Sequence, residues 1–378
     1  MTRTTRSRTR SRIAVGLTAV AALLTAACGG AEQRDGAAPA AEYTLKYSSS
    51  TAPEVGFQKQ IAWYMNEVEK RTGGRVTFEK FYGGSLLSSA DTLPGLVDGR
   101  TETAYMVPAY APASLPLWNM MFVPLPGTNS EVIARSQVEL VKERTALATE
   151  LEAAGIKILI FNMLSDIGTV ITPEPITDVE GMRGLKVRAL GYMSQALQLV
   201  GTQPLAIDQP EVFESIERGV IDGTSATTMD TVTGDGLAEV APWVTQLNIG
   251  QWGGVGFAIG LDTWNGLPPD VQAVMTEVSE EFYVVGPRLL TDLEAESCDG
   301  LLAAGGGVTR LPEDQTQAWV AQIGDSLWEK WRADARKTVA PDVVASLEER
   351  YRAVTAELLP RSTYTSGLEL CRARTSLG

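Results

Sequence analysis

The order of hydrophobic and polar residues in the first part of the chain switches between strand-like and helix-like periods. Residues 43–49 (YTLKYSS) alternate between apolar and polar side chains, which predicts a strand. Apolar residues then recur at helical spacing over 57–68. A strand over 75–82, a short helix over 89–98 and a strand over 103–107 are expected next. This β-α-β-α-β order predicts a largely parallel sheet with helices on its faces.

The rest of the chain repeats this alternation and then becomes mostly helical. Strands are predicted over 157–162, 185–188, 204–207 and 220–225, and helices over 130–154, 192–200, 210–218, 269–302, 313–336 and 342–358. The proline-bounded apolar run 116–126 is predicted to be buried core. The glycine-rich apolar stretch 246–261 is predicted to form strands that cross back to the first lobe.

A chain that crosses more than once between two α/β lobes forms a hinged clamshell, and the cleft between the lobes is a common ligand site. The predicted fold is therefore α/β and two-lobed, with an interlobe cleft and long helices in the C-terminal part. We expect the first lobe to comprise residues 42–163 and about 255–290. The second lobe, with the C-terminal helices, is expected to comprise 164–254 and about 291–378.

The N-terminal segment has the pattern of a secretory signal. Residues 1–12 carry five arginines and no acidic residue, and residues 13–27 form an uncharged apolar run. That run is too short to span a bilayer, which needs about 20 residues. Cys28 follows it in the order LTAACGG, which resembles a bacterial lipobox with an atypical Thr25. We expect a signal peptide over 1–27, lipidation of Cys28 and a small-residue tether over 28–41. The alternative is a plain signal peptide with an incidental cysteine.

These features predict an extracytoplasmic protein that is lipid-anchored on the outer face of the cytoplasmic membrane. The net charge of −14 argues against nucleic acid and anionic lipid as partners. The sequence contains no histidine, which removes Ser-His-Asp and Cys-His catalysis and the commonest transition-metal ligand. We expect no cofactor and no metal. Cys298 and Cys371 are expected to form a disulfide, with two buried free thiols as the alternative.

Four motifs stand in order along the chain. They are VEKRTGGRV (68–76) with FYGGSL (81–86), DVEGMRGLKVR (178–188), EVF (211–213) with RGVIDG (218–223), and WNGLPPDVQAV (264–274). Together they resemble the solute receptors of tripartite ATP-independent periplasmic (TRAP) transporters, the DctP family, from about residue 43 to 335. The resemblance implies a clamshell like that of type II periplasmic binding proteins, a small carboxylate ligand and a membrane permease as partner. We expect a monomer.

In that family the arginine at the LKVR position binds the ligand carboxylate, and this position is Arg188. An arginine suits this role because its guanidinium presents a rigid fork of hydrogen-bond donors that matches the two oxygens of a carboxylate. The resemblance and the strand-end rule name further candidates for the ligand site. These are Ser49, Ser50, Ser88, Asn162, Gln209, Ser225, Thr227 and Trp252. Each also has the plainer interpretation of a loop, capping or core residue.

The chain also departs from the family pattern around the predicted site. Gln209 stands where an aromatic residue commonly stacks on the ligand, and Ala226 stands where an asparagine often follows the DG motif. Residues 165–170 contain no second arginine, which sialic-acid-type members carry there. The ligand of a well-known member is therefore not transferred to this chain.

Three functions were weighed on the sequence. The first is a binding protein that captures an organic acid for a TRAP transporter. The second is the solute-binding protein of an ATP-driven importer, and the third is an exported hydrolase that uses a carboxylate pair. No nucleophile elbow, metal-ligand cluster or phosphate-binding loop is present in the sequence. The ordered motifs favour the first function, a binding protein and not an enzyme.

Overall fold

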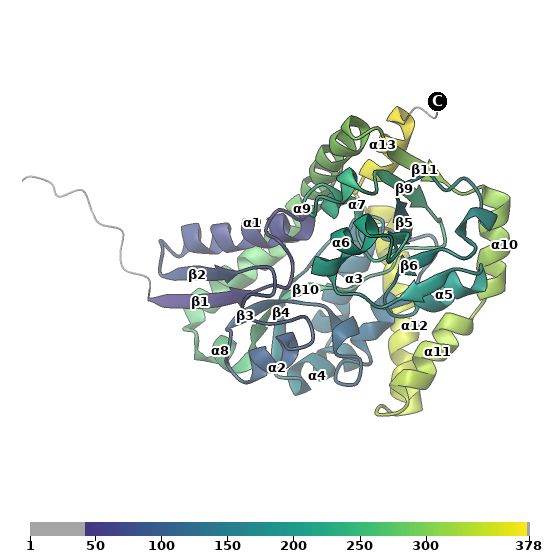
Figure 1. Ribbon diagram of the computed structural model, residues 1–378. Coiled ribbons are helices and arrows are strands. Elements are labelled where there is room, and N and C mark those ends of the chain that lie inside the picture. Colours follow the sequence, from purple (N-terminus) through teal and green to yellow (C-terminus); the bar gives the residue numbers. More distant parts are fainter. Residues whose placement is uncertain (1–41, 376–378) are drawn as a thin grey trace, which may run out of the picture. The chain divides into compact units, whose positions relative to one another are not determined.

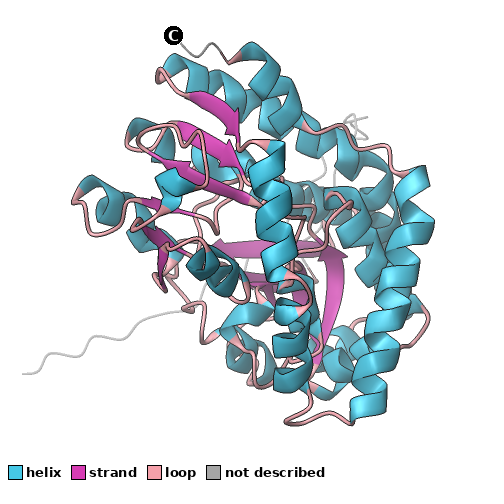
Figure 2. Cartoon of the chain, turned by 90° about the vertical axis from the view of Figure 1, so that its right-hand side faces the viewer, coloured by secondary structure: helices cyan, strands magenta, loops and turns pink. Residues whose placement is uncertain are grey.

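The structure, a computed structural model, describes residues 42–375. The predicted signal peptide, Cys28 and the tether lie outside this part of the chain. Two β-sheets organise the described residues, and helices surround both groups of strands (Figures 1 and 2). No helix within 42–375 is both long and apolar enough to cross a membrane.

The first sheet contains five strands in the order β2-β1-β3-β10-β4. Its members are β1 (Tyr43–Ser48), β2 (Val76–Phe81), β3 (Thr103–Met106), β4 (Ile156–Phe161) and β10 (Gly256–Gly260). Helices α1 (Gly56–Arg71) and α2 (Thr92–Val97) connect the first three strands, which run parallel. Only β10 is antiparallel to its neighbours β3 and β4. The predicted β-α-β-α-β unit is therefore present.

The second sheet contains six strands in the order β11-β9-β5-β8-β6-β7. Its members are β5 (Thr169–Thr172), β6 (Lys186–Arg188), β7 (Gln203–Leu205), β8 (Gly223–Thr224), β9 (Trp243–Gln246) and β11 (Gly307–Arg310). Strand β5 is antiparallel to β8 and β9. Strands β5, β9 and β11, of four residues each, were not predicted from the sequence, because so short a segment shows little periodicity.

The chain passes between the two sheets several times. It leaves the first sheet after β4 and enters the second at β5. The glycine-rich stretch then returns it from β9 to β10, as the sequence predicted. The 35-residue helix α9 (Pro269–Ala303) packs on α1 and β4 beside the first sheet and on β11 beside the second. The architecture is thus two α/β lobes joined by several connections.

Two of the predicted long helices are broken. The segment 130–154 forms α3 (Ser130–Lys142) and α4 (Ala146–Ala153), which are separated at Arg144 with a φ of 54°. The segment 313–336 forms α10 (Glu313–Ile323) and α11 (Ser326–Ala335), which are separated at Gly324 with a φ of 49°. The predictions were wrong because apolar residues continue at helical spacing through a turn in which one residue is left-handed.

The C-terminal helices contact both lobes. Helix α12 (Pro341–Leu358) packs on α3, and Arg350 on α12 pairs with Glu143 through an Nη2–Oε1 distance of 2.6 Å. Trp331 on α11 donates from Nε1 to the carbonyl of Pro116 in the first lobe at 3.0 Å. Trp319 on α10 donates instead to Ala196 in the second lobe at 3.0 Å. We therefore propose that the lobes follow the two sheets and that these helices bridge them, whereas the sequence assigned them to the second lobe.

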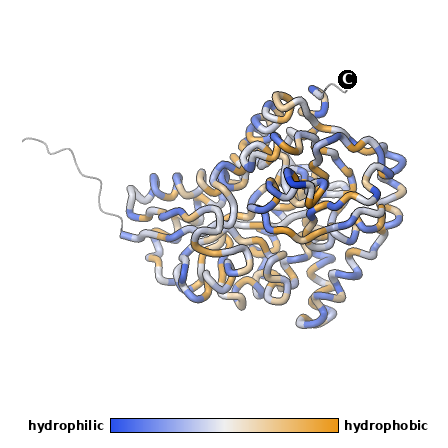
Figure 3. Tube along the Cα trace, viewed as in Figure 1, coloured by the Kyte–Doolittle hydropathy of each residue, from blue (hydrophilic) through white to orange (hydrophobic). Residues whose placement is uncertain are grey.

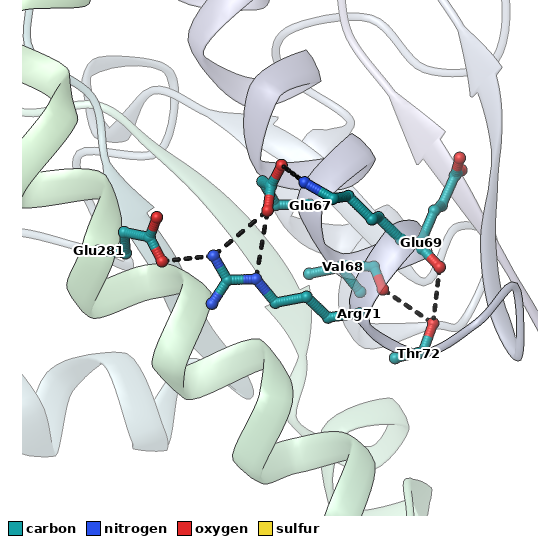
Figure 4. Close-up of polar contacts among 7 residues, drawn as sticks. Glu67, Val68, Glu69, Arg71, Thr72 and Glu281 are labelled. Atoms are coloured by element: carbon teal, nitrogen blue, oxygen red, sulfur yellow. Dashed lines mark hydrogen bonds and ion pairs between the residues drawn. The ribbon is translucent and has the colours of Figure 1, made fainter.

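The helix ends near the first sheet are held by local polar contacts. The hydroxyl of Thr72 donates to the carbonyl of Val68 at 2.8 Å and so closes the last turn of α1 (Figure 4). Arg71 pairs with Glu67 on the same helix at 3.2 Å and also with Glu281 on α9 (Figure 4). These contacts join α1 to the helix that reaches both lobes.

Hydrophobic burial accounts for the packing of the elements. The surface helices carry hydrophilic and hydrophobic residues in alternation along their length (Figure 3). All residues of the 3-10 helix η2 (Trp118–Phe122) are buried, so the run 116–126 supplies core as predicted. Cys298 on α9 forms a disulfide with Cys371 on α13 (Gly367–Arg374), with an S–S distance of 2.03 Å. This bond fastens the last described helix to α9.

Candidate ligand-binding site

A small cavity of about 70 Å³ lies between the lobes. Ser50, Phe57 and Tyr105 line it from the first lobe, and Arg188 and Gln209 line it from the second. The connections between the lobes complete its wall with Leu164, Ile167, Trp252 and Val255. A cavity built from both lobes matches the interlobe cleft that the sequence predicted.

Arg188 is held at the end of a strand in the second sheet. Strand β6 lies between β7 and β8 and runs parallel to both, so the chain reaches the cavity at the carboxyl end of the strand. The guanidinium Nε donates to the carbonyl of Ile207 at 2.7 Å, and Nη1 donates to the carbonyl of Ala226 at 2.9 Å. Of the five N–H groups of a guanidinium, three remain, on Nη1 and Nη2. These three form the end of the fork that can accept a carboxylate.

The charge of Arg188 has no close counter-ion among residues 42–375. The side chain is 1 % exposed, and no carboxylate lies within 4.0 Å of it in this part of the chain. Burial lowers the pKa of Arg188 below its usual value, while Tyr110, Asp235 and Asp208 favour the charged form. An arginine stays protonated in proteins, so the site presents a buried positive charge. Such a charge is costly unless it is paired.

Tyrosine side chains of the first lobe reach toward this charge. Tyr110 ends the short 3-10 helix η1 (Pro108–Tyr110), which follows β3, and it stabilises the charged form of Arg188 across the cavity. Tyr105 on β3 stacks on Phe57 with ring centres 4.5 Å apart and an interplanar angle of 13°. Both tyrosines line the cavity. A ligand carboxylate beside Arg188 would therefore also meet a phenol from the opposite lobe.

Polar side chains on the second-lobe wall bond to one another. Gln209 donates from Nε2 to Oδ2 of Asp235 at 2.5 Å and accepts from the hydroxyl of Thr227 at 3.3 Å. Burial raises the pKa of Asp235 to about 6, although Gln209 and Arg188 act in the opposite direction. Gln209 thus links an acid to the cavity wall.

Five of the residues predicted from the sequence line the cavity. They are Ser50, Arg188, Gln209, Thr227 and Trp252. Trp252 is fully buried and stacks at a tilt on Phe122 with ring centres 5.5 Å apart. The structure therefore brings together the predicted Arg188, Gln209 and Trp252 around one cavity.

The other four predicted residues do not line the cavity. Ser88 is exposed and donates to Asp91 at 2.6 Å near the start of α2. Ser49 is buried and accepts from the amide of Gln58 at 2.6 Å. Ser50, two residues after β1 ends at Ser48, lines the cavity, whereas Ser49 does not, because successive side chains of an extended chain point in opposite directions.

Asn162 and Ser225 likewise lie behind the cavity wall. The amide of Asn162 donates to the carbonyl of Phe57 at 3.3 Å and so supports a residue that does line the cavity. The backbone N–H of Ser225 donates to the carbonyl of Arg188 at 2.8 Å. Both side chains are buried, and their positions suit support of the binding surface more than contact with a ligand.

Most of the apolar wall was not identified from the sequence. Phe57, Tyr105, Tyr110 and Phe122 come from a helix, a strand and two 3-10 helices of the first lobe. The strand-end rule that selected Ser50 also applies to Tyr110, which follows β3 closely. No local signal identifies Phe57 or Phe122, since their spacing is that of ordinary core residues. Within 42–375 no group of three acidic or cysteine side chains is placed to hold a metal ion.

Sequence comparison assigns the chain to a family of transport proteins. The pattern described as "Bacterial extracellular solute-binding protein, family 7" (DctP) matches residues 48–334. A solute-binding protein of Sulfitobacter sp. is 27 % identical over 70 % of this chain and 80 % of its own length. The C4-dicarboxylate-binding periplasmic protein DctP of Rhodobacter capsulatus is 26 % identical over 63 % of this chain and 71 % of its own length.

Solved structures share the fold at lower identity. A marine metagenome TRAP solute-binding protein, in complex with 3-hydroxybenzoate, matches with a TM-score of 0.73 at 19 % identity, over 84 % of this chain and 99 % of that one. A Rhodoferax ferrireducens TRAP solute-binding protein with copurified benzoate matches with a TM-score of 0.71 at 21 % identity, over 83 % and 98 %. With the match over residues 48–334, this chain belongs to the DctP family of TRAP-transporter solute-binding proteins.

Proposed function

We propose that this protein captures a small carboxylate by pairing it with Arg188 and delivers it to the membrane permease of a TRAP transporter. One observation carries the proposal: a guanidinium that is 1 % exposed has no carboxylate within 4.0 Å among residues 42–375. A ligand carboxylate would supply the missing charge. The relatives agree with this proposal, since they include C4-dicarboxylate-binding proteins and solute-binding proteins in complex with benzoate and galacturonate.

The burial of Arg188 implies a conformational step. Residues of both lobes line the cavity and Arg188 is 1 % exposed, so we expect the lobes to separate when a ligand enters and to close around it. In the proposed cycle the carboxylate docks on Arg188 in the open form, and the first lobe then closes with Tyr110 beside it. The closed form is the one that a permease would recognise. The family match does not favour the ATP-driven importer or the hydrolase that the sequence left open.

Calorimetric titration of an Arg188→Met variant tests the assignment. Loss of one partner of a buried ion pair costs about 3–5 kcal/mol, which corresponds to a loss of affinity of roughly 100-fold or more for the acid that binds the unmodified protein. Arg183→Met is the matched control, because Arg183 lies five residues earlier and pairs with Glu180 on the exposed surface. Unchanged affinity in Arg188→Met would overturn the assignment, and equal loss in both variants would point to unfolding.

The remaining parts of the proposal concern the state of the protein in the cell. Lipidation of Cys28 would anchor it to the outer face of the membrane, and intact-mass analysis of the exported protein would reveal the acyl mass. A mature protein without added lipid would favour the plain signal peptide. We also propose a monomer without catalytic activity, which light scattering and a broad hydrolase panel would test.

A further inference from the structure

We infer that the ligand is a small, largely apolar monocarboxylate, and not a dicarboxylate or a sugar acid. This inference rests on the proposed function, because it takes Arg188 as the carboxylate anchor. It concerns the part of the ligand that lies beyond the carboxylate. Three observations on the cavity carry it: the charge of its wall, the state of its polar side chains and its size.

Arg188 is the only charged residue among those that line the cavity. A dicarboxylate would therefore place its second negative charge in a site with no second cation. Asp235 and Asp208 already interact electrostatically with Arg188, so their negative charges would also repel a second carboxylate of the ligand. Burying a second carboxylate without a partner is strongly unfavourable. The charge of the wall thus fits a monoanion.

Most hydroxyl and amide groups on the second-lobe wall are already engaged with other protein groups. The Thr227 hydroxyl bonds to Gln209, and the amide of Gln209 bonds to Asp235. Thr231 donates to the carbonyl of Thr228 at 2.7 Å. In the first lobe Thr51 accepts from the amide of Gln58 at 2.9 Å. The polar groups of the wall that remain are the hydroxyls of Ser50, Tyr105 and Tyr110 and the indole N–H of Trp252, which has no partner within 42–375. A sugar acid needs a partner for each of its hydroxyls, and beside the carboxylate anchor these groups are too few.

The rest of the wall is hydrocarbon and aromatic ring. The stacked pair Phe57 and Tyr105 faces the cavity from one lobe, and the tilted pair Phe122 and Trp252 lines it from another side. A cavity of about 70 Å³ holds roughly five to seven water-sized groups, if each needs about 10–15 Å³. That size suits a short branched chain or a single ring attached to the carboxylate.

Matched acids separate this inference from the proposed function. Titration calorimetry would compare 3-methylbutanoate with succinate and benzoate with terephthalate, and it would include galacturonate. We expect at least one of the two apolar monocarboxylates to bind, with the matching dicarboxylate and galacturonate weaker by roughly 100-fold or more. If succinate, terephthalate or galacturonate binds as tightly as either monocarboxylate, and Arg188→Met abolishes that binding, the inference fails and the proposed function stands. If none of the five acids binds, the inference fails, whereas the proposed function fails only if Arg188→Met binds, with equal affinity, the acid that the unmodified protein captures.

A variant of the wall tests the apolar contact directly. Val107 lines the cavity and is partly exposed, and Val107→Thr would add a hydroxyl with almost no change in shape. We expect binding of the preferred monocarboxylate to weaken by about 10-fold, since a hydroxyl would be buried against hydrocarbon. Val343→Thr is the control, as this valine is also partly exposed but lies on α12 away from the cavity. Equal or tighter binding by Val107→Thr would contradict the apolar wall.

Discussion

Tyr110, in the first lobe, interacts with the charged side chain of Arg188 in the second lobe. It lines the cavity and stabilises the charged form of Arg188. We expect Tyr110→Phe to weaken carboxylate binding by about 10- to 100-fold, since a hydrogen bond to a charged group contributes roughly 1.5–3 kcal/mol. Calorimetry would measure this loss.

The control for Tyr110 is Tyr82→Phe, since Tyr82 is partly exposed and does not line the cavity. A double-mutant cycle with Arg188→Met would show whether the two residues act together on the ligand. If the losses from Tyr110→Phe and Arg188→Met simply add, the phenol does not share the carboxylate with Arg188.

Asp230 is a buried acid close to the cavity that should make stability depend on pH. Burial raises its pKa from 3.8 to about 6, and neither carboxylate oxygen has a partner in good hydrogen-bonding geometry. Because the folded pKa lies above the unfolded one, the stability linked to its neutral form is full below pH 3.8 and is lost as the pH rises through about 6. The loss amounts to about 3 kcal/mol.

Asp230→Asn should therefore be more stable than the unmodified protein at pH 7 and should show a shallower fall of stability between pH 4 and 6, the remaining slope coming from acids such as Asp235. Denaturant titrations at several pH values would measure the free energy of unfolding. Asp262→Asn is the control, because Asp262 is exposed on α8 (Leu261–Gly266) and should leave the slope unchanged. If the free energy of unfolding depends on pH equally in Asp230→Asn and in the unmodified protein, folding does not raise the pKa of Asp230.

The breaks in the helices show what periodicity alone cannot predict. Gly324 separates α10 from α11 with φ 49° and ψ −127°, a conformation that is essentially restricted to glycine. We expect Gly324→Ala to lower the free energy of unfolding by about 1–3 kcal/mol, since a Cβ there makes only an ordinary contact of 3.6 Å with the carbonyl oxygen of Ala321 and the cost is backbone strain. Chemical denaturation would measure it.

Gly266→Ala is the matched control for this backbone effect. Gly266 also has open space around an added Cβ, but it has no positive φ. It should therefore change stability by less than about 1 kcal/mol, or even stabilise the protein by limiting the unfolded chain. If both variants lose the same stability, the turn at Gly324 does not require glycine.

At the scale of the whole molecule, a site lined by both lobes is expected to open and close by motion between them. Several connections join the lobes, including the long helix α9, so the motion must be absorbed by short segments such as those after β4 and β9. We expect solution scattering to show a smaller radius of gyration when the acid identified by calorimetry saturates the protein. An unchanged radius at saturation would argue against closure around the ligand.

The binding equilibrium should also be visible as stability. A ligand present at 100 times its dissociation constant adds about 2.7 kcal/mol to the free energy of unfolding. The thermal midpoint of Arg188→Met should therefore not respond to the acid, whereas that of Arg183→Met should rise as in the unmodified protein. A common response in both variants would place the ligand elsewhere.

The sequence by itself determined the family, the strand order of the first β-α-β-α-β unit and the position of Arg188. These predictions rest on the periodicity of hydrophobic residues and on motifs of contiguous residues. Both can be recognised in the sequence because they do not depend on contacts between distant segments. The same reasoning placed Ser88 and Ser49 in the site, and it extended two helices through turns at Arg144 and Gly324. Local pattern does not reveal which side of a strand end faces the cleft.

Only the tertiary structure decided what surrounds the arginine. The apolar wall draws Phe57, Tyr105 and Phe122 from separate elements, and Trp252 from the connection between β9 and β10. Whether Arg188 has a counter-ion depends on which acids fold close to it, and these lie on remote segments of the chain. The charge of the site and the character of its ligand are therefore properties of packing between lobes, because they depend on distances in space that no spacing along the sequence encodes.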